Sequence, residues 1–264
     1  MLFLGDYIDR GPNIRETLQI VRRMVESENA LAIMGNHEYN AICFHLHDKN
    51  GGHLRKHLIK NIKQHHETLV QFHNKQDEYE DYIEWFKTLP LYYEDKRFRA
   101  VHACWDEGHI NYLKSCLVDG KLLEEQIYES AQSGTSLDLA VGITLKGKEV
   151  EIPNGYGFKD KDGTIRKETR IKWWLDPNKH YLNELSMVTI PKLNEKDIRI
   201  SEVSGHYHED ERPVFFGHYW LNGDPFLIRD NICCLDFSVA RKGVLASYRM
   251  NGETELHKEN IVFV

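Results

Sequence analysis

The segment Gly5-Asp6-Tyr7-Ile8-Asp9-Arg10-Gly11 and the later segment Gly35-Asn36-His37-Glu38 decide the fold of this 264-residue chain. Each one directly follows a short apolar run, residues 2–4 in the first case and residues 31–34 in the second. Short apolar runs of this kind predict buried strands. The polar side chains that follow them lie at the carboxyl ends of the strands, where open α/β sheets build their active sites.

A helix is predicted between these two strands, because apolar residues recur at helical spacing after Pro12 and Asn13. The recurring residues are Ile14, Leu18, Val21 and Val25. A strand, a helix and a second strand form a βαβ unit, so the two strands are predicted to be parallel. The segment from Gly35 to Glu38 is then a loop at the end of the second strand.

Later parts of the chain give weaker patterns. Helices are predicted over residues 53–74, 78–89 and 122–131, and a hairpin joins residues 91–93 to residues 98–102. Strands return at residues 213–217, 232–238 and 244–250 and in the last run before the C-terminus. Four histidines of the first long helix lie among Lys, Gln and Glu, so we expect a solvated face rather than a metal cluster. They are His57, His65, His66 and His73.

The region of about residues 106–200 is irregular, and no Pro/Gly/Ser-rich linker separates it from its surroundings. We expect it to be an insertion that caps the site, within a single domain of residues 1–264. Its segment Asp160-Lys161-Asp162-Gly163 is superficially like a calcium loop. The glycine stands at the fourth loop position and Ile171 at the twelfth, so a hairpin turn is predicted instead.

The composition excludes several classes of protein. Hydrophobic residues make up 41% of the chain, which is ample for a core, and the formal net charge of -7 leaves no basic face for nucleic acid. The five cysteines are an odd number without CxxC spacing, which indicates reduced thiols in a cytoplasmic protein. No apolar run approaches the ~20 residues of a membrane span, and we expect no membrane partner.

Asp6, Asn36, His102 and His218 each follow an apolar, strand-like run. Singly, each has a structural explanation, as a cap, a turn former or a buried histidine with satisfied hydrogen bonds. Together they offer a carboxylate, an amide oxygen and two imidazoles, a donor set that suits Mn²⁺, Fe or Zn²⁺. It is improbable that all four residues stand at strand ends for unrelated structural reasons, so the set favours a metal site.

With Val101-His102-Ala103 and Gly217-His218 added, the motifs resemble those of the calcineurin-like metallophosphoesterases. More narrowly, they resemble the branch of phosphoprotein phosphatases and symmetrical diadenosine tetraphosphatases. The resemblance implies an α/β sandwich of two mixed β-sheets flanked by helices, with a cap insertion. It also implies metal-dependent hydrolysis of a phosphomonoester or phosphoanhydride by an activated water. The substrate would be a phosphorylated small molecule, a nucleotide or a phosphoprotein.

The resemblance also assigns roles to residues. Asp6 would bridge two divalent cations, which we expect to be Mn²⁺, and Asn36, His102 and His218 would complete one of the two sites. His37 would be the general acid, oriented by Asp9, and Arg10 would bind the substrate phosphate.

Two assignments have competitors. His206, in Gly205-His206-Tyr207-His208, competes with His218 as the last ligand, and we favour His218 because residues 207–213 are charged and end in proline. The resemblance implies a second phosphate-binding arginine in the cap. We expect Arg170 in this role rather than Arg166.

One family motif is missing. The family begins with Asp-x-His on its first strand, and this pattern occurs nowhere in the sequence. The intact later motifs favour an N-terminally truncated chain. The alternatives are a chain that holds one metal instead of two, and a degenerate member that binds phosphate ligands or a protein partner with little or no catalysis.

Overall fold

The computed structural model describes residues 1–49, 51–159, 163–193, 198–200 and 205–264. Its first unit contains β1 (Leu2–Phe3), α1 (Ile14–Glu26) and β2 (Leu31–Ala32). The two strands are parallel, with Leu2 opposite Leu31, as the βαβ pattern predicts. Helix α1 buries Ile14, Leu18 and Val21, so its apolar stripe holds it against the core.

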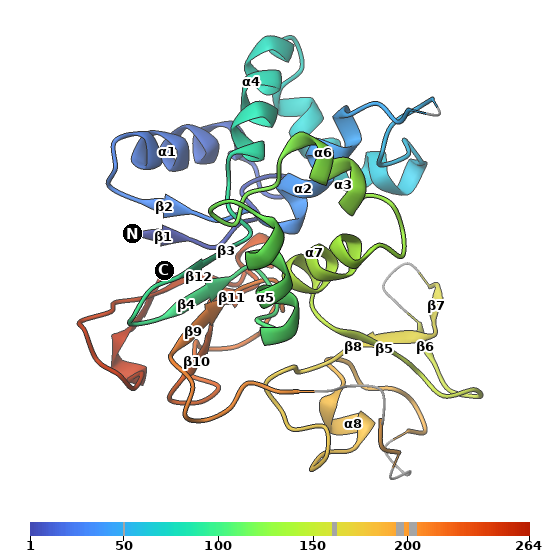
Figure 1. The fold of residues 1–264 in the computed structure, drawn as a ribbon, viewed down its shortest axis with the longest axis vertical. Coiled ribbons are helices and arrows are strands. Elements are labelled where there is room, and N and C mark those ends of the chain that lie inside the picture. Colours follow the sequence, from blue (N-terminus) through green and yellow to red (C-terminus); the bar gives the residue numbers. More distant parts are fainter. Residues whose placement is uncertain (50, 160–162, 194–197, 201–204) are drawn as a thin grey trace.

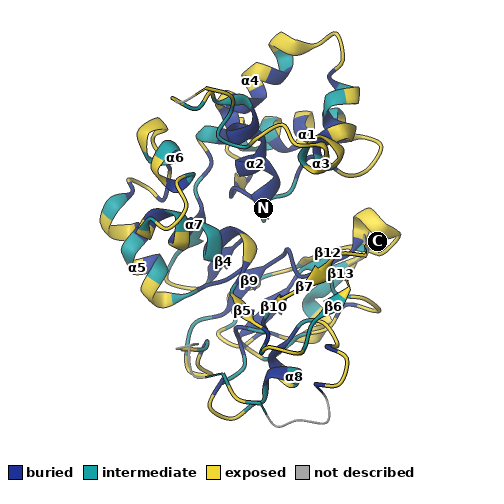
Figure 2. Cartoon of the chain, turned by 90° about the vertical axis from the view of Figure 1, so that its right-hand side faces the viewer, coloured by how far each residue is buried: buried dark blue, intermediate teal, exposed yellow. Residues whose placement is uncertain are grey.

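The next helices are α2 (Asn36–His45), α3 (Ile59–Gln71) and α4 (Gln76–Lys87) (Figure 1). The prediction of a loop over Gly35 to Glu38 was wrong, because Asn36 already begins α2. All of its residues up to Phe44 are buried, and Figure 2 shows α2 in dark blue. A helix that is buried all round has no amphipathic period, which is why the sequence pattern missed it. Helix α3 starts later than predicted, after an irregular loop that contains Gly51 and Gly52.

The main sheet has the strand order β10-β9-β4-β3. It contains β3 (Tyr92–Glu94), β4 (Arg99–Val101), β9 (Val214–Phe216) and β10 (Ile232–Cys234). Strands β3 and β4 form the predicted antiparallel hairpin, whereas β4, β9 and β10 run parallel to one another. Because β4 and β9 are parallel neighbours, the residues that follow them, among them His102 and His218, emerge at the same edge of the sheet.

A separate antiparallel sheet contains β11 (Asp236–Phe237), β12 (Val244–Tyr248) and β13 (Ile261–Phe263). Short 3₁₀ turns, η1 (Val239–Arg241) and η2 (Lys258–Asn260), precede its second and third strands. The strands predicted over residues 232–238 and 244–250 are thus present, the first of them divided between β10 and β11.

The region expected to be a cap has two parts. The first contains α5 (Glu107–Cys116), α6 (Glu124–Ser130) and α7 (Ser136–Lys146), whose apolar side chains join the main core. The second contains β5 (Glu149–Glu151), β6 (Phe158–Lys159), β7 (Ile165–Arg166), β8 (Glu168–Arg170) and α8 (Leu182–Leu185). This second part has a small core of its own around Val150, Ile171 and Leu182.

Two further findings concern this region and the chain as a whole. Strands β6 and β7 pair antiparallel on either side of the predicted hairpin turn, whose residues 160–162 lie outside the described residues. Within the described ranges, no helix has both the length and the apolar composition that crossing a bilayer requires.

Candidate active site

Two glycines bring the ends of β1 and β2 into contact. A Cβ atom on Gly5 would lie 2.5 Å from the Cα of Gly35, and a Cβ atom on Gly35 would lie 2.3 Å from the backbone nitrogen of Asp6. Gly5 also has a φ of +92°, which favours glycine. Only glycine permits this approach, which places the Asp6 side chain at the N-terminus of α2. There the backbone N–H of His37 donates to Oδ1 of Asp6 at 3.1 Å.

Glu38 stabilises the same junction through hydrogen bonds to its backbone. Its carboxylate accepts backbone N–H groups from Asp6 at 2.8 Å, from Tyr7 at 2.7 Å and from Gly35 at 2.9 Å. The side chain is fully buried, and this burial, together with the charge of Asp6, raises the pKa of Glu38 to about 7. The sequence motif contains Glu38, but the pattern alone gave it no role.

A cluster of ligand atoms lies above this junction. Asp6, His102 and His218 offer donor atoms that all lie within 4.8 Å of one another. Nδ1–H of His102 donates to the carbonyl of Leu4 at 2.6 Å, so Nε2 faces the site. This nitrogen lies 3.2 Å from Oδ1 of Asp6 and 3.2 Å from Oδ1 of Asn36. The structure therefore brings together the four residues that the sequence singled out as metal ligands.

The donor set fits a divalent cation. Burial by itself lowers the pKa of His102, but the neighbouring Asp6 carboxylate outweighs it and raises the pKa to about 9, so this position favours positive charge. Burial holds the pKa of His218 well below its usual range, which keeps the imidazole in its neutral, ligand form. Both ring nitrogens of His218 are buried, and neither finds a hydrogen-bond partner in the ranges that the structure describes. Buried polar atoms are rarely left unpaired, and a cation would satisfy one of these two nitrogens.

His37 stands beside this cluster in a fixed orientation. Nδ1–H of His37 donates to Oδ2 of Asp9 at 2.6 Å, and its Nε2 lies 3.9 Å from Oδ2 of Asp6. Burial disfavours the imidazolium form, but the carboxylates of Asp6 and Asp9 outweigh it and raise the pKa of His37. Burial would raise the pKa of Asp9, whereas its hydrogen bonds with His37 and His65 lower it to about 2, so this carboxylate is ionised near neutral pH.

His65 corrects the expectation that the histidines of α3 lie on a solvated face. It is 4% exposed, and its Nδ1–H donates to Oδ1 of Asp9 at 2.5 Å. Its Nε2 lies 2.6 Å from the hydroxyl of Tyr79, which burial keeps protonated by raising its pKa. Thr68 donates to the same oxygen of Asp9 at 2.8 Å. His66 is exposed, as predicted.

The sequence could have predicted that Thr68 and His65 lie on one face of α3, because residues three apart on a helix are neighbours. The contact of this face with Asp9 could not be predicted, since Asp9 is distant in sequence.

Arg10 and a second arginine share one aromatic ring at the site. The guanidinium carbon of Arg10 lies 3.9 Å from the ring centroid of Trp220, and that of Arg241 lies 4.2 Å from it. Among the described residues, neither guanidinium has a hydrogen-bond or ion-pair partner. The sequence patterns did not single out Trp220 or Arg241.

The remaining predicted residues divide into two groups. Arg170 lies close enough to His218 to lower the pKa of His218, after the larger effect of burial, and its buried Nε has no hydrogen-bond partner within the described part of the chain. Arg166 lies exposed on β7. Nδ1 of His206 lies 3.9 Å from Oδ1 of Asp176, and its ring lies tilted against that of His208 at 4.4 Å, so His206 does not belong to the ligand cluster. The geometry thus brings Arg170 and His218 to the site and leaves Arg166 and His206 outside the cluster.

Backbone strain is concentrated around these side chains. Asp6, Asp9, His218 and Trp220 all have positive φ values, between 51° and 72°, although none of them is glycine. Such conformations cost about 1–3 kcal/mol each and persist where the surrounding contacts hold them. The turn after β1 and the turn after β9 are therefore shaped to aim these side chains at one place.

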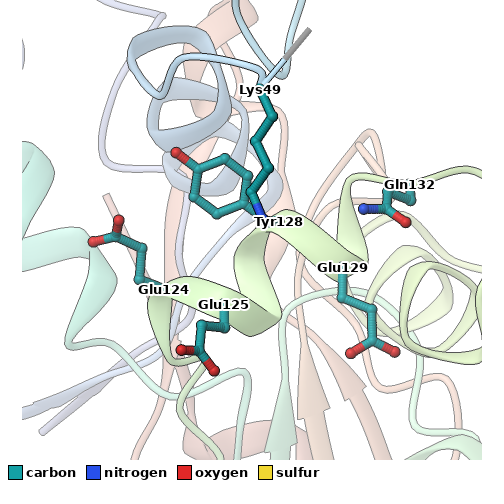
Figure 3. Close-up of a pocket in the computed structure, with 6 residues that line it drawn as sticks. All are labelled: Lys49, Glu124, Glu125, Tyr128, Glu129 and Gln132. Atoms are coloured by element: carbon teal, nitrogen blue, oxygen red, sulfur yellow. The ribbon is translucent and has the colours of Figure 1, made fainter.

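A depression elsewhere on the surface offers a contrast. It has a volume of about 480 Å³ and is lined by residues of α6 with Lys49 above them (Figure 3). Glu124, Glu125, Tyr128 and Glu129 belong to α6, and Gln132 lies just after its end. Three carboxylates against one ammonium group give this depression a negative charge, which disfavours a phosphate ligand.

The fold and the ligand cluster define a metal-dependent phosphoesterase class. The family model of the calcineurin-like phosphoesterases matches residues 1–217, and the chain belongs to this family. The family match confirms the predicted α/β fold class.

Other comparisons add less. None of the curated proteins matches the sequence. Among solved structures, the chain is similar to a protein serine/threonine phosphatase from Saccharomyces cerevisiae with similarity to human phosphatase PP5. The two share 13% identity with a TM-score of 0.41, over 100% of this chain and 69% of that chain.

Proposed function

We propose that this protein hydrolyses a phosphomonoester or a phosphoanhydride in a metal-dependent reaction, as in the phosphoprotein phosphatase and diadenosine tetraphosphatase branch of its family. One observation carries the proposal. Acceptor atoms of Asp6, Asn36 and His102 converge beside His37, whose orientation Asp9 fixes. Such a cluster can hold a cation next to a proton donor, which is what hydrolysis of a phosphate ester requires.

The proposed ligands are Asp6, Asn36, His102 and His218. Oxygen and imidazole donors together suit Mn²⁺, with Fe or Zn²⁺ as alternatives. When bound, a divalent cation supplies Lewis-acid stabilisation of charge on the phosphoryl oxygens and makes water a better nucleophile. By resemblance to the family, Asp6 would be a ligand of two cations, and Asn36, His102 and His218 would complete the site of one of them.

His37 transfers the proton in this proposal. Its Nδ1–H remains bound to Asp9, so Nε2 is the atom that can act on substrate. The carboxylates of Asp6 and Asp9 raise the pKa of His37 and so favour its protonated form, from which Nε2 can donate a proton to the leaving oxygen. Asp9 takes up no proton in this step, since its carboxylate has a pKa of about 2 and serves to orient and stabilise the imidazolium.

Arg10 and Arg170 bind the phosphoryl group in this proposal. A guanidinium presents several N–H groups in a plane and matches phosphate oxygens in pairs. Among the described residues the Arg10 guanidinium has no hydrogen-bond partner, and in Arg170 the buried Nε has none, whereas its Nη2 pairs with Glu149 at 3.3 Å. The substrate would be a phosphorylated small molecule, a nucleotide or a phosphoprotein. All five cysteines are free thiols, which accords with a cytoplasmic location.

Turnover of para-nitrophenyl phosphate with added Mn²⁺ tests the proposal. We expect activity that a chelator abolishes and that falls by about 100-fold or more in His37→Ala, because a general acid contributes ~10²–10⁴. Asp6→Asn should also lose activity, through weaker metal binding. His66→Ala is the matched control, because His66 is exposed and lies outside the site. Mn²⁺ binding without turnover would instead support a phosphate-binding or partner-binding protein.

A further inference from the structure

Arg241 belongs to none of the motifs that define the family resemblance, and yet it lies at the proposed active site. Its guanidinium and that of Arg10 both lie over the ring of Trp220, at 4.2 Å and 3.9 Å from the centroid. The two guanidinium carbons are therefore no farther apart than the sum of these distances. Arg10 in turn is close enough to Asp6 for the carboxylate to raise its pKa against the larger, opposing effect of desolvation. Arg10 thus connects Arg241 to the Asp6 carboxylate of the ligand cluster.

The backbone fixes the position of Arg241. The carboxylate of Asp236 accepts the backbone N–H groups of Trp220 at 3.3 Å and of Ser238 at 3.0 Å. The hydroxyl of Ser238 donates to the carbonyl of Leu221 at 3.0 Å, and the backbone N–H of Arg241 donates to the carbonyl of Ser238 at 2.7 Å. These bonds join the turn after β9 to the turn η1. Arg241 is consequently held beside Trp220 by its own turn as well as by stacking.

Electrostatics argue against a purely structural role for this arrangement. The Arg241 guanidinium lowers the pKa of Arg10, as a nearby like charge does. Stacking on an indole offsets part of that repulsion. Among the described residues, no carboxylate forms an ion pair with either arginine. The carboxylates of Asp6, Asp9 and Asp236 raise the pKa of Arg10 from a distance, against the larger effect of desolvation, but neither guanidinium contacts a carboxylate among the described residues, so both keep N–H groups for a further anion.

We propose that Arg241, held on Trp220 beside Arg10, determines specificity by binding a second phosphoryl group of the substrate, next to the one that is hydrolysed. The inference rests on the proposed function for the location of the first phosphoryl group, which Arg10 and Arg170 hold. It selects phosphoanhydrides, such as nucleoside diphosphates and longer polyphosphates, over simple monoesters. A single phosphoryl group bound at the metal ligands leaves Arg241 without a partner, whereas the adjoining phosphoryl group of an anhydride reaches the second guanidinium.

The first test measures binding. Phosphonate analogues of AMP and ADP resist hydrolysis and differ by one phosphoryl group, and calorimetry at a fixed free Mn²⁺ concentration compares them. We expect the wild-type protein to bind the two-phosphoryl analogue at least about tenfold more tightly, as a charged hydrogen-bonded contact provides. Arg241→Gln should lose this preference and retain its affinity for the one-phosphoryl analogue. Lys242→Gln removes the same charge from the next residue and should retain the preference.

The second test measures turnover. With Arg241→Gln, we expect kcat/KM for P¹,P⁴-di(adenosine-5′) tetraphosphate to fall about 10- to 100-fold, by loss of a charged contact, while kcat/KM for para-nitrophenyl phosphate stays within a factor of about three. An equal fall for both substrates would overturn the inference, because Arg241 would then act on the hydrolysed group itself. So would a wild-type protein that binds both analogues equally, or a larger effect of the variant on an acidic phosphopeptide than on the tetraphosphate.

The two tests separate this inference from the proposed function. A protein that hydrolyses neither substrate but prefers the two-phosphoryl analogue through Arg241 would refute the catalytic proposal and retain the subsite. A protein that hydrolyses para-nitrophenyl phosphate but shows no Arg241-dependent preference would do the reverse. Arg241 is exposed, so the substitution is expected to leave the fold intact, and a thermal unfolding curve checks this.

Discussion

Replacing His65 with leucine removes the link between Tyr79 and Asp9 without opening a large cavity. In the native protein, His65 donates to Asp9 at 2.5 Å and lies 2.6 Å from the hydroxyl of Tyr79, and its side chain is 5% exposed. Leucine fills much of the same space but offers neither a donor nor an acceptor. The variant therefore measures hydrogen bonding in the interior more than packing.

The magnitude follows from the partners that are lost. A hydrogen bond to an ionised carboxylate contributes ~1.5–3 kcal/mol and a neutral one ~1 kcal/mol to the free energy of unfolding. Thr68 remains bound to the affected oxygen of Asp9, which limits the loss, while the hydroxyl of Tyr79 is left buried and unpaired. We expect a destabilisation of about 3 kcal/mol, or a fall in Tm of about 6–12 °C for a chain of this size.

Activity should fall as well, because Asp9 orients His37. We expect kcat for para-nitrophenyl phosphate to decrease by at least about tenfold, the lower end of the effect of losing an orienting partner. His65→Asn, which can still donate to Asp9, should recover part of the stability and of the turnover.

Urea and thermal unfolding, with the phosphatase assay, compare these variants with His66→Leu. His66 is adjacent and exposed, so its substitution should change the free energy of unfolding by less than about 0.5 kcal/mol. If His65→Leu unfolds at the same urea concentration as His66→Leu and retains full activity, the network through Asp9 does not have the role that its distances suggest.

Three further predictions concern the junction, the acid limit and the metal ligands. Gly35→Ala should destabilise the protein by at least about 2 kcal/mol in urea unfolding, because its Cβ would lie 2.3 Å from the backbone nitrogen of Asp6. Gly142→Ala, in α7 with open space around it, should instead stabilise by ~0.5–1 kcal/mol. The pKa of Asp9 is lowered from 3.8 to about 2, so its ionised carboxylate contributes about 2 kcal/mol to the free energy of unfolding above pH 3.8. This contribution is lost as the pH falls through about 2. In Asp9→Asn, the free energy of unfolding should therefore depend less on pH between about pH 5 and pH 2. Mn²⁺ at a hundredfold excess over its Kd is expected to stabilise the folded protein by about 2.7 kcal/mol. It should therefore raise Tm in the wild-type protein and in His206→Ala, but much less in His218→Ala.

The polar segments after β1 and β2 made the site predictable from the sequence. Asp6 and Asn36 follow apolar runs whose strands are parallel neighbours, so their convergence is a consequence of sheet geometry. The same rule placed His102 and His218, because β4 and β9 are parallel neighbours in the main sheet. Residues that lie at strand ends are thus located by local pattern and topology together.

Contacts made between elements were not predictable in this way. His65 has the same surrounding residue types as His66, and only the packing of α3 against the rest of the fold makes one of them buried and the other exposed. Arg241 and Trp220 meet through a turn after β9 and a turn after β11, neither of which has a hydrophobic period. Their stacking depends on positive φ values at Trp220 and Ser238, which a sequence pattern does not indicate for residues other than glycine.

The short turn at Asp9 and Arg10 connects the two halves of the proposed reaction. Asp9 has a φ of 72°, a left-handed conformation that aspartate tolerates better than most residues. Asp9 is buried, with one carboxylate oxygen bound to His37 and the other to His65 and Thr68, whereas Arg10 is exposed and stacks on Trp220. In the proposed reaction, Asp9 therefore orients the proton donor, while the next residue, Arg10, binds the phosphate. Because one strained turn positions both, a substitution that relaxes its backbone should weaken proton transfer and phosphate binding together, whereas His65→Leu should affect only the first.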